Sequence, residues 1–342
     1  MRVDVRWQTG RVSNQERDPG EVVCESHGDG DAIEVLGPRD VPLGGPRAMT
    51  VRRTLPTRQR SLIGAWCFAD HYGPDPVSES GGMVVTPHPH TGLATVSWLF
   101  TGEVEHKDSA GNRAMVRPGE LNLMTAGRGI SHSENSTGRT EILHGAQLWL
   151  ALPDHARDVE PGFDHYAPEP VTGEGWEARV FLGSMLGSAS PVTTHTPLLG
   201  AELVLASGTE LVVDVDPAFE HGLLVDHGVV SLEGQEVKAA ELAYAASGRD
   251  CLRIVAGQDT RVLLLGGAPF DESIIMWWNF VGRTHEEIVQ YREEWQAQIL
   301  RDGELVADGQ DVAQGRFGVV VDDHDTPIPA PPMPNARLRH RR

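Results

Sequence analysis

Two short motifs within one strand-like stretch constrain the fold of this chain more than any other feature. The first is His88-Pro-His90, and the second is His132-Ser-Glu134. Side chains two residues apart on a strand point to the same face of the sheet. Strand-like runs separated by turn residues lie between the two motifs. If these strands wind into a small barrel, the four side chains face its interior, and the sequence predicts a metal site there.

Three other histidines and one aspartate lie in or near this region, and we do not expect them to be metal ligands. A single His-x-His pair is most often two surface residues, whereas two such motifs in one strand-rich segment seldom coincide by chance. We interpret His106 as a hairpin residue and His144 as a residue that packs near the site or hydrogen-bonds its ligands. Asp70 and His71 stand beside a Gly-Pro turn. We expect them to cap that turn or to form hydrogen bonds that support the metal ligands from outside, with catalysis as the alternative.

Imidazole and carboxylate ligands together suit iron, manganese, nickel, copper or zinc. Since no thiolate takes part, a structural zinc site is not expected. Four protein ligands leave two positions open on an octahedral ion, enough for a chelating substrate and dioxygen. Histidine-carboxylate sites of this kind are typical of non-haem Fe(II) oxygenases.

Longer strings around the motifs resemble a known family. Gly82, five residues and His88-Pro-His90 match the first cupin motif, and the strings LIGAWCFADHYGP (62–74), HPHTGLATVSWLFTGEVEHKDSAGN (88–112) and MTAGRGISHSEN (124–135) resemble pirin. The similarity extends through 143–153 and 269–288 and covers most of the chain.

The resemblance to pirins implies both a ligand set and a departure from the general cupin pattern. It implies one iron ion, Fe(II)/Fe(III), per chain, bound at His88, His90, His132 and Glu134. The usual cupin glutamate of the first motif is absent, since Ala94 and Thr95 occupy its candidate positions. Its role passes to Glu134, as in pirins.

The resemblance also implies function, and it leaves three alternatives open. Some pirins are implicated as quercetin 2,3-dioxygenases, so we expect a flavonol-like substrate and dioxygen, with Glu134 as the catalytic base. Other pirins are described as iron- and redox-dependent regulators, either transcription cofactors or modulators of metabolic enzymes, which would require a protein partner. The third alternative is a metal that only stabilises the barrel.

The fold class that follows is all-β, with two cupin-type β-barrels (a bicupin), a C-terminal helix and an extended tail. The expected divisions are an N-terminal extended segment at 1–45, a metal-carrying barrel at 46–153, a proline-rich connection at 154–175, a degenerate barrel at 176–272, a strand and helix at 273–303, and a Pro/Arg-rich tail at 304–342. The second barrel lacks a His-x-Glu motif, and Asp214 and Asp216 stand where offsets from Gly228 would place histidines. We therefore expect no metal in it.

The C-terminal part changes from strand to helix periodicity. Residues 284–287, Thr-His-Glu-Glu, form a capping box, and apolar residues then recur at helical spacing until Gly303, which is expected to end the helix. Beyond 317 the chain is rich in proline and then arginine. We expect an arm that lies across the protein's own acidic surface, with a partner-binding tail as the alternative.

Charge and cysteine content exclude several classes of protein. The formal net charge is −20, so direct nucleic-acid binding is not expected, because phosphate binding needs clustered lysine and arginine. The three cysteines are far apart and form no Cys-x-x-Cys pair, which suits a reducing cytoplasm. The N-terminal residues lack the apolar core of a signal peptide, and no apolar run approaches the ~20 residues of a membrane span. We expect a cytoplasmic monomer.

Overall fold

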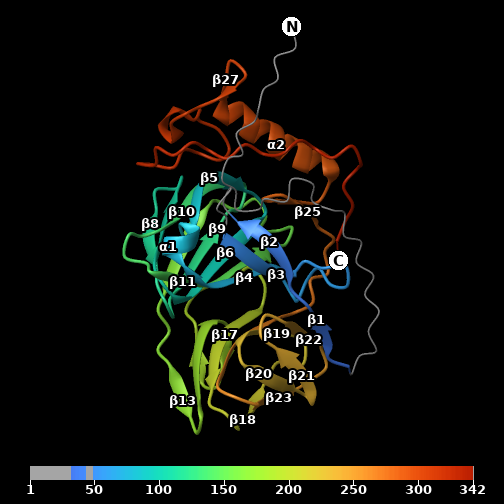
Figure 1. The fold of residues 1–342 in the computed structure, drawn as a ribbon. Coiled ribbons are helices and arrows are strands. Elements are labelled where there is room, and N and C mark those ends of the chain that lie inside the picture. Colours follow the sequence, from blue (N-terminus) through green and yellow to red (C-terminus); the bar gives the residue numbers. More distant parts are fainter. Residues whose placement is uncertain (1–31, 44–48, 342) are drawn as a thin grey trace.

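The computed structural model describes residues 32–43 and 49–341, and the predicted N-terminal segment therefore lies mostly outside the described residues. Two β-barrels are stacked on one another, and the C-terminal helix lies on the far side of the first barrel (Figure 1). The predicted all-β, two-barrel class with a C-terminal helix is confirmed. No helix in the described ranges combines the length and the apolar character needed to cross a membrane.

The first barrel consists of a seven-stranded and a four-stranded antiparallel sheet. The larger sheet has the order β12-β9-β6-β11-β4-β3-β2 and the smaller the order β5-β10-β7-β8. Their bounds are β2 (Arg39–Leu43), β3 (Met49–Leu55), β4 (Trp66–Pro76), β5 (Val84–His90), β6 (Leu93–Thr101), β7 (Val104–Asp108), β8 (Arg113–Val116), β9 (Leu121–Thr125), β10 (Ile130–Ser136), β11 (Ile142–Ala151) and β12 (Gly162–Tyr166). A short helix, α1 (Val77–Ser80), follows β4. β12 lies within the stretch predicted as the interdomain connection, where it extends the first barrel by pairing with β9.

The second barrel repeats this arrangement. Its sheets have the orders β1-β22-β19-β24-β17-β14-β13 and β18-β23-β20-β21. Their bounds are β1 (Glu34–Leu36), β13 (Val171–Gly173), β14 (Trp176–Leu182), β17 (Leu198–Leu205), β18 (Glu210–Asp214), β19 (Glu220–His227), β20 (Val229–Leu232), β21 (Gln235–Lys238), β22 (Leu242–Ala245), β23 (Cys251–Ala256) and β24 (Thr260–Gly267); a two-residue hairpin, β15 (Ser184–Met185) and β16 (Ser188–Ala189), stands apart.

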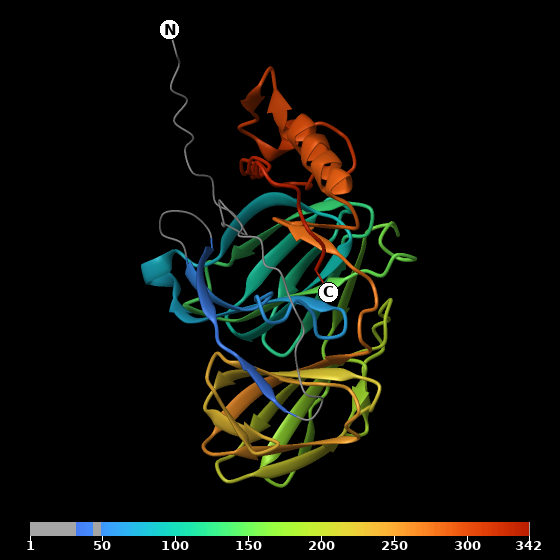
Figure 2. The same ribbon diagram turned by 90° about the vertical axis from the view of Figure 1, so that its right-hand side faces the viewer.

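The two barrels share a hydrophobic core. Trp66 and Trp98 of the first barrel belong to the same buried cluster as Phe181 and Leu263 of the second. The rings of Trp98 and Phe181 lie 4.5 Å apart. The N-terminal segment also joins the barrels, because β1 pairs with β22 of the second barrel and β2 with β3 of the first (Figure 2).

The C-terminal region covers the first barrel. It contains β25 (Ile275–Trp277), β26 (Phe280–Gly282), α2 (His285–Ile299), β27 (Leu300–Arg301), β28 (Glu304–Leu305) and the 3-10 turn η1 (Gly309–Asp311). The predicted capping box is present, since the Thr284 side chain accepts from the Glu287 backbone N–H and the Glu287 carboxylate from that of Thr284. The prediction for Gly303 is wrong: the helix ends at Ile299, and Gly303 turns the β27–β28 hairpin at a φ of +83°.

The tail is held by buried apolar contacts as well as by charge, in contrast to the predicted arm on an acidic surface. The Ile328 side chain is 2% exposed and joins the cluster formed by α2 and the first barrel. Its backbone N–H donates to the Pro87 carbonyl at 2.8 Å, and its carbonyl accepts from Trp295 Nε1 at 2.7 Å. Farther along, Arg337 forms an exposed ion pair with Glu286. Burial of Ile328 therefore anchors the tail beside the strand that carries His88.

We expect Ile328→Ala to lower the free energy of unfolding by about 2–4 kcal/mol, because it removes buried methyl groups and leaves a cavity. Chemical denaturation at pH 7 measures the difference. Ile142→Ala is the matched control, since the Ile142 side chain is 43% exposed. An equally small effect of both substitutions would show that the tail does not contribute to the core.

Candidate metal centre

The first barrel brings the four predicted ligands into one pocket through the pairing of two strands. β5 carries His88 and His90, and β10 carries His132 and Glu134. In the antiparallel register His132 lies directly opposite His88. A bulge between His132 and Glu134 shifts the register against β5, whereas the pairing of β10 with β7 continues regularly. All four side chains are buried and line the same pocket.

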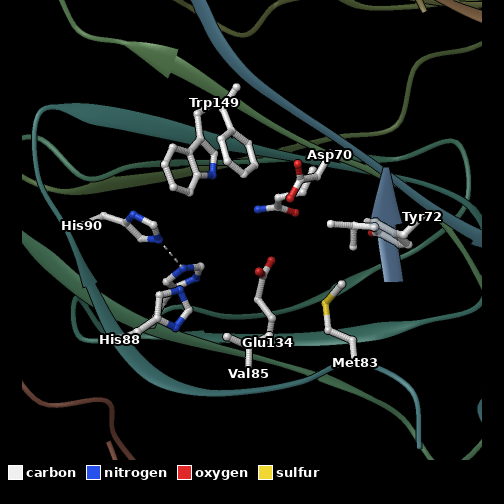
Figure 3. Close-up of a pocket in the computed structure, with 12 residues that line it drawn as sticks. Asp70, Tyr72, Met83, Val85, His88, His90, Glu134 and Trp149 are labelled. Carbon is white, nitrogen blue, oxygen red and sulfur yellow. Dashed lines mark hydrogen bonds between the residues drawn. The ribbon is translucent and has the colours of Figure 1, made fainter. Parts of the chain in front are cut away.

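The three imidazoles bring nitrogen atoms close to one another. His88 Nδ1 lies 3.0 Å from the Thr86 carbonyl oxygen, and His90 Nδ1 lies 3.2 Å from that of Asn279 in the turn between β25 and β26. A carbonyl only accepts, so both Nδ1 atoms carry the proton and both Nε2 atoms keep a lone pair. His90 Nε2 lies 3.1 Å from His132 Nε2 (Figure 3). Donor atoms of all three imidazoles lie within 4.8 Å of one another.

Burial keeps these imidazoles neutral at pH 7. It lowers the pKa of His88 to about 4, and it holds the pKa values of His90 and His132 well below their ordinary range, with further lowering by the neighbouring imidazoles. A metal ligand must be deprotonated, so the lone pairs are available without displacing a proton at neutral pH. Tautomer, burial and convergence therefore all fit a bound transition metal.

Glu134 reaches into the pocket with its carboxylate directed to the space between the imidazoles and Asp70 (Figure 3). Its Oε1 accepts a hydrogen bond of 3.1 Å from Ser97 Oγ. Burial raises the pKa of Glu134. A second group of candidate donor atoms within 4.8 Å of one another joins Glu134 to His132 and His106.

His106 lies in the β7–β8 hairpin, as expected, where it pairs with Ala114, but its side chain and that of Asp108 also belong to the environment of the pocket. Along β7 the side chains of Val104, His106 and Asp108 are buried, and the two residues between them are less so. The register places His106 opposite Glu134 and Asp108 opposite His132. His106-x-Asp108 is thus a third motif with two-residue spacing. That spacing is the signal that could have identified it from the sequence.

The pocket beside these residues is narrow and largely apolar. Phe68, Met83, Val85 and Trp149 contribute to its walls, and the cavity measures about 20 Å³. The rings of Phe68 and Trp149 stack at 4.1 Å. Across from Glu134 lies a polar wall containing Asp70 (Figure 3).

Asp70 and His71 are not turn residues, in contrast to the prediction, because both lie within strand β4. The buried side chain of Arg53 donates to Asp70 at 2.6 and 2.7 Å. His71 faces away from the metal pocket toward the second barrel. There His71 Nε2 and His144 Nε2 lie 2.7 and 2.5 Å from Asp226 Oδ1. His144 therefore belongs to the interface between the barrels, and it does not line the metal pocket.

The chain matches known proteins over most of its length. Residues 48–150 match the family model described as Pirin, and residues 200–301 match the Pirin C-terminal cupin domain. A Pseudomonas aeruginosa protein named "Putative quercetin 2,3-dioxygenase PA1205" is 45% identical over 270 residues, covering 79% of this chain and 85% of that protein. A pirin-like protein of Caulobacter vibrioides is 34% identical, covering 72% of this chain and 88% of that protein.

Solved structures agree with these sequence matches. The crystal structure of a quercetin 2,3-dioxygenase from Acinetobacter baumannii superposes with a TM-score of 0.81 at 38% sequence identity. The alignment covers 90% of this chain and 97% of that one. The similarity therefore includes both barrels and much of the C-terminal region.

Proposed function

Because the chain belongs to the pirin family of the cupin superfamily, we propose that it is an iron-dependent dioxygenase of the quercetin 2,3-dioxygenase type. The iron would be held by His88, His90, His132 and Glu134, and the substrate would be a flavonol-like molecule. The observation that supports this most directly is the convergence of nitrogen atoms from three neutral imidazoles. The names of the similar proteins from Pseudomonas aeruginosa and Acinetobacter baumannii point to the same chemistry.

When bound, the ion supplies Lewis acidity toward a substrate hydroxyl and redox chemistry with dioxygen. The residues of the chain do the remaining work. Glu134 accepts the proton of the flavonol hydroxyl at its carboxylate, and Ser97 Oγ orients that carboxylate by donating to Oε1. The stacked rings of Phe68 and Trp149 provide an apolar wall that excludes water from the reacting atoms.

One specific observation favours the second candidate, an iron- and redox-dependent regulator. The cavity of about 20 Å³ is far smaller than the ~300–1,000 Å³ of ordinary small-molecule sites. A flavonol would enter only after wall side chains such as Met83 move aside. A regulator needs no substrate-sized cavity, because a change at the metal is passed to a partner surface. In this second candidate the same four ligands hold the iron.

Oxygen consumption by the iron-loaded protein with a panel of flavonols separates the two candidates. Turnover that requires both iron and flavonol supports the dioxygenase. Full iron loading without any flavonol-dependent oxygen uptake would contradict it and favour the regulator.

Loss of one ligand is expected to empty the site. We expect His88→Ala to lower the metal content of anaerobically reconstituted protein from one ion per chain to near zero, since His88 supplies one of three converging imidazoles. Elemental analysis after removal of loosely bound metal measures this. His155→Ala is the matched control, because His155 is exposed and lies outside the pocket. Near-stoichiometric metal in the His88 variant would rule out this site as the principal one.

A further inference from the structure

We propose that Asp108 and His106 are positioning residues that fix the tautomer of His132 through a chain of side-chain hydrogen bonds. This control of a ligand goes beyond the proposed catalytic activity and rests on that proposal only in taking His132 as a metal ligand. His106 Nε2 lies 3.3 Å from Asp108 Oδ2, and His106 Nδ1 lies 3.4 Å from His132 Nδ1. The three side chains are buried and belong to the paired strands β7 and β10.

The chain of hydrogen bonds has a defined direction because Asp108 is held by the turn that follows it. Asp108 Oδ1 accepts from the backbone N–H groups of Ala110 and Asn112 at 2.9 and 3.0 Å, and from Asn112 Nδ2 at 3.1 Å. Oδ2 accepts from Asn112 Nδ2 at 2.9 Å and faces His106. With the carboxylate fixed as an acceptor, the proton between it and His106 must lie on His106 Nε2.

Each following proton position is then determined. A metal ion at His132 Nε2 uses the lone pair of that atom, so the single proton of the His132 ring lies on Nδ1, which faces His106 Nδ1 at 3.4 Å. His106 Nδ1 can then only accept, which agrees with the proton on His106 Nε2 facing Asp108. His132 therefore donates its Nδ1 proton to His106. His132 Nε2, which faces His90 Nε2, is left with the lone pair that a metal ion requires.

His132 differs in this respect from the other two imidazoles. His88 and His90 are oriented by the backbone carbonyls of Thr86 and Asn279, which no side-chain substitution removes. The orientation of His132 depends on side chains alone. The ring of His106 is itself held in place by packing against Phe163 of β12, with ring centroids 4.9 Å apart. His132 is therefore the ligand whose tautomer can be changed by substitution at a distance.

Asp108→Asn tests this proposal with almost no change in side-chain volume. The turn needs an acceptor at the position of Oδ1, where three N–H groups converge, so the new amide places its oxygen there and its NH₂ toward His106. His106 Nε2 must then accept, His106 Nδ1 must donate, and His132 shifts to the tautomer with its proton on Nε2. Metal affinity should fall by about 10–100-fold, the effect typical of losing an outer partner of a metal-ligating histidine.

The first readout is the ¹⁵N NMR spectrum of histidine-labelled, metal-free protein, which reports the tautomer of His132 without any catalysis. The second is the affinity for Fe(II), measured anaerobically by chelator competition. Glu105→Gln is the matched control, since it also converts a carboxylate to an amide on β7, but on the opposite face, where Glu105 pairs with Arg113. We expect this control to keep the parent tautomer and affinity.

His106→Phe provides a second variant that removes the acceptor for His132 Nδ1 while keeping an aromatic ring. We expect it to weaken Fe(II) binding by a similar factor. If both folded variants retain the parent tautomer of His132 and the parent affinity, the proposal is overturned. A shifted tautomer in protein that shows no flavonol turnover would support the hydrogen-bonded chain while counting against the proposed enzyme.

Discussion

Glu134→Gln is expected to lower flavonol turnover per bound iron by about 10²–10⁴-fold, the usual contribution of general-base assistance. The amide keeps the size of the side chain and one ligating oxygen but loses the charge and the proton acceptor. Because the three imidazoles remain, iron should bind more weakly but still bind. Burial raises the pKa of Glu134 in the protein without bound metal.

The measurement compares parent and variant at saturating flavonol, with turnover divided by the iron content of each sample. Glu103→Gln serves as the matched control, because Glu103 pairs with Arg117 outside the pocket. A fully loaded Glu134 variant that turns over as fast as the parent would restrict Glu134 to the role of a ligand. Absence of turnover in the parent itself would count against the enzyme and leave the ligand role untouched.

The motif spacing predicted that the four proposed ligand side chains share one pocket, because the spacing depends only on strand geometry. Side chains two apart share a face in any strand, so His88 and His90 could be placed on the same side before the fold was known. Alternation of apolar and polar residues indicates a strand in the same way, and the structure has strands at Met49–Leu55 and Cys251–Ala256. Local periodicity therefore predicts which side chains lie close together when those side chains belong to the same strand or to paired strands.

The same reasoning missed Asp108 because this residue has two roles. The run 108–112 has the composition of a turn, and Asp108 Oδ1 does accept the backbone N–H groups of that turn. Its second oxygen faces His106 inside the barrel. The turn composition of this run therefore led us to overlook that Asp108 is also a strand residue whose side chain faces the barrel interior. Similarly, Gly303 was expected to end the helix, but it turns the hairpin that follows the helix.

Contacts between the barrels could not be predicted from local patterns. Asp226 lies 155 residues from His71 and 82 from His144, and it belongs to the other barrel. Nothing in the neighbourhood of either histidine indicates such a partner. Asp226 also accepts from Arg261 Nη1 at 3.3 Å and from His227 Nδ1 at 3.1 Å. One buried carboxylate therefore accepts hydrogen bonds from four side chains at the interface between the barrels.

The pKa of Asp226 reflects this environment. Burial by itself would raise the pKa, but the hydrogen bonds from His144 and His71 outweigh burial and hold the pKa well below its ordinary value. A carboxyl group whose pKa is lower in the folded than in the unfolded state stabilises the fold at every pH above the unfolded value, which is about 3.9. This stabilisation is lost as the pH falls below about 4 and through the folded value.

Asp226→Asn is therefore expected to lower the free energy of unfolding by about 3–5 kcal/mol at pH 7. The amide keeps one accepting oxygen, but it loses the charge that pairs with Arg261 and places an NH₂ group where a second accepting oxygen stood. Asp214→Asn, at an exposed position of the same barrel, is the matched control and should change stability little. Denaturation of both variants and the parent across pH 3–8 measures the effect. The difference between parent and Asp226→Asn should be full at neutral pH and should narrow below about pH 4, where the parent carboxylate becomes protonated in the unfolded chain. If the difference in the free energy of unfolding stays constant down to pH 3, the packing of the Asp226 side chain, and not its charge, stabilises the contact between the two barrels.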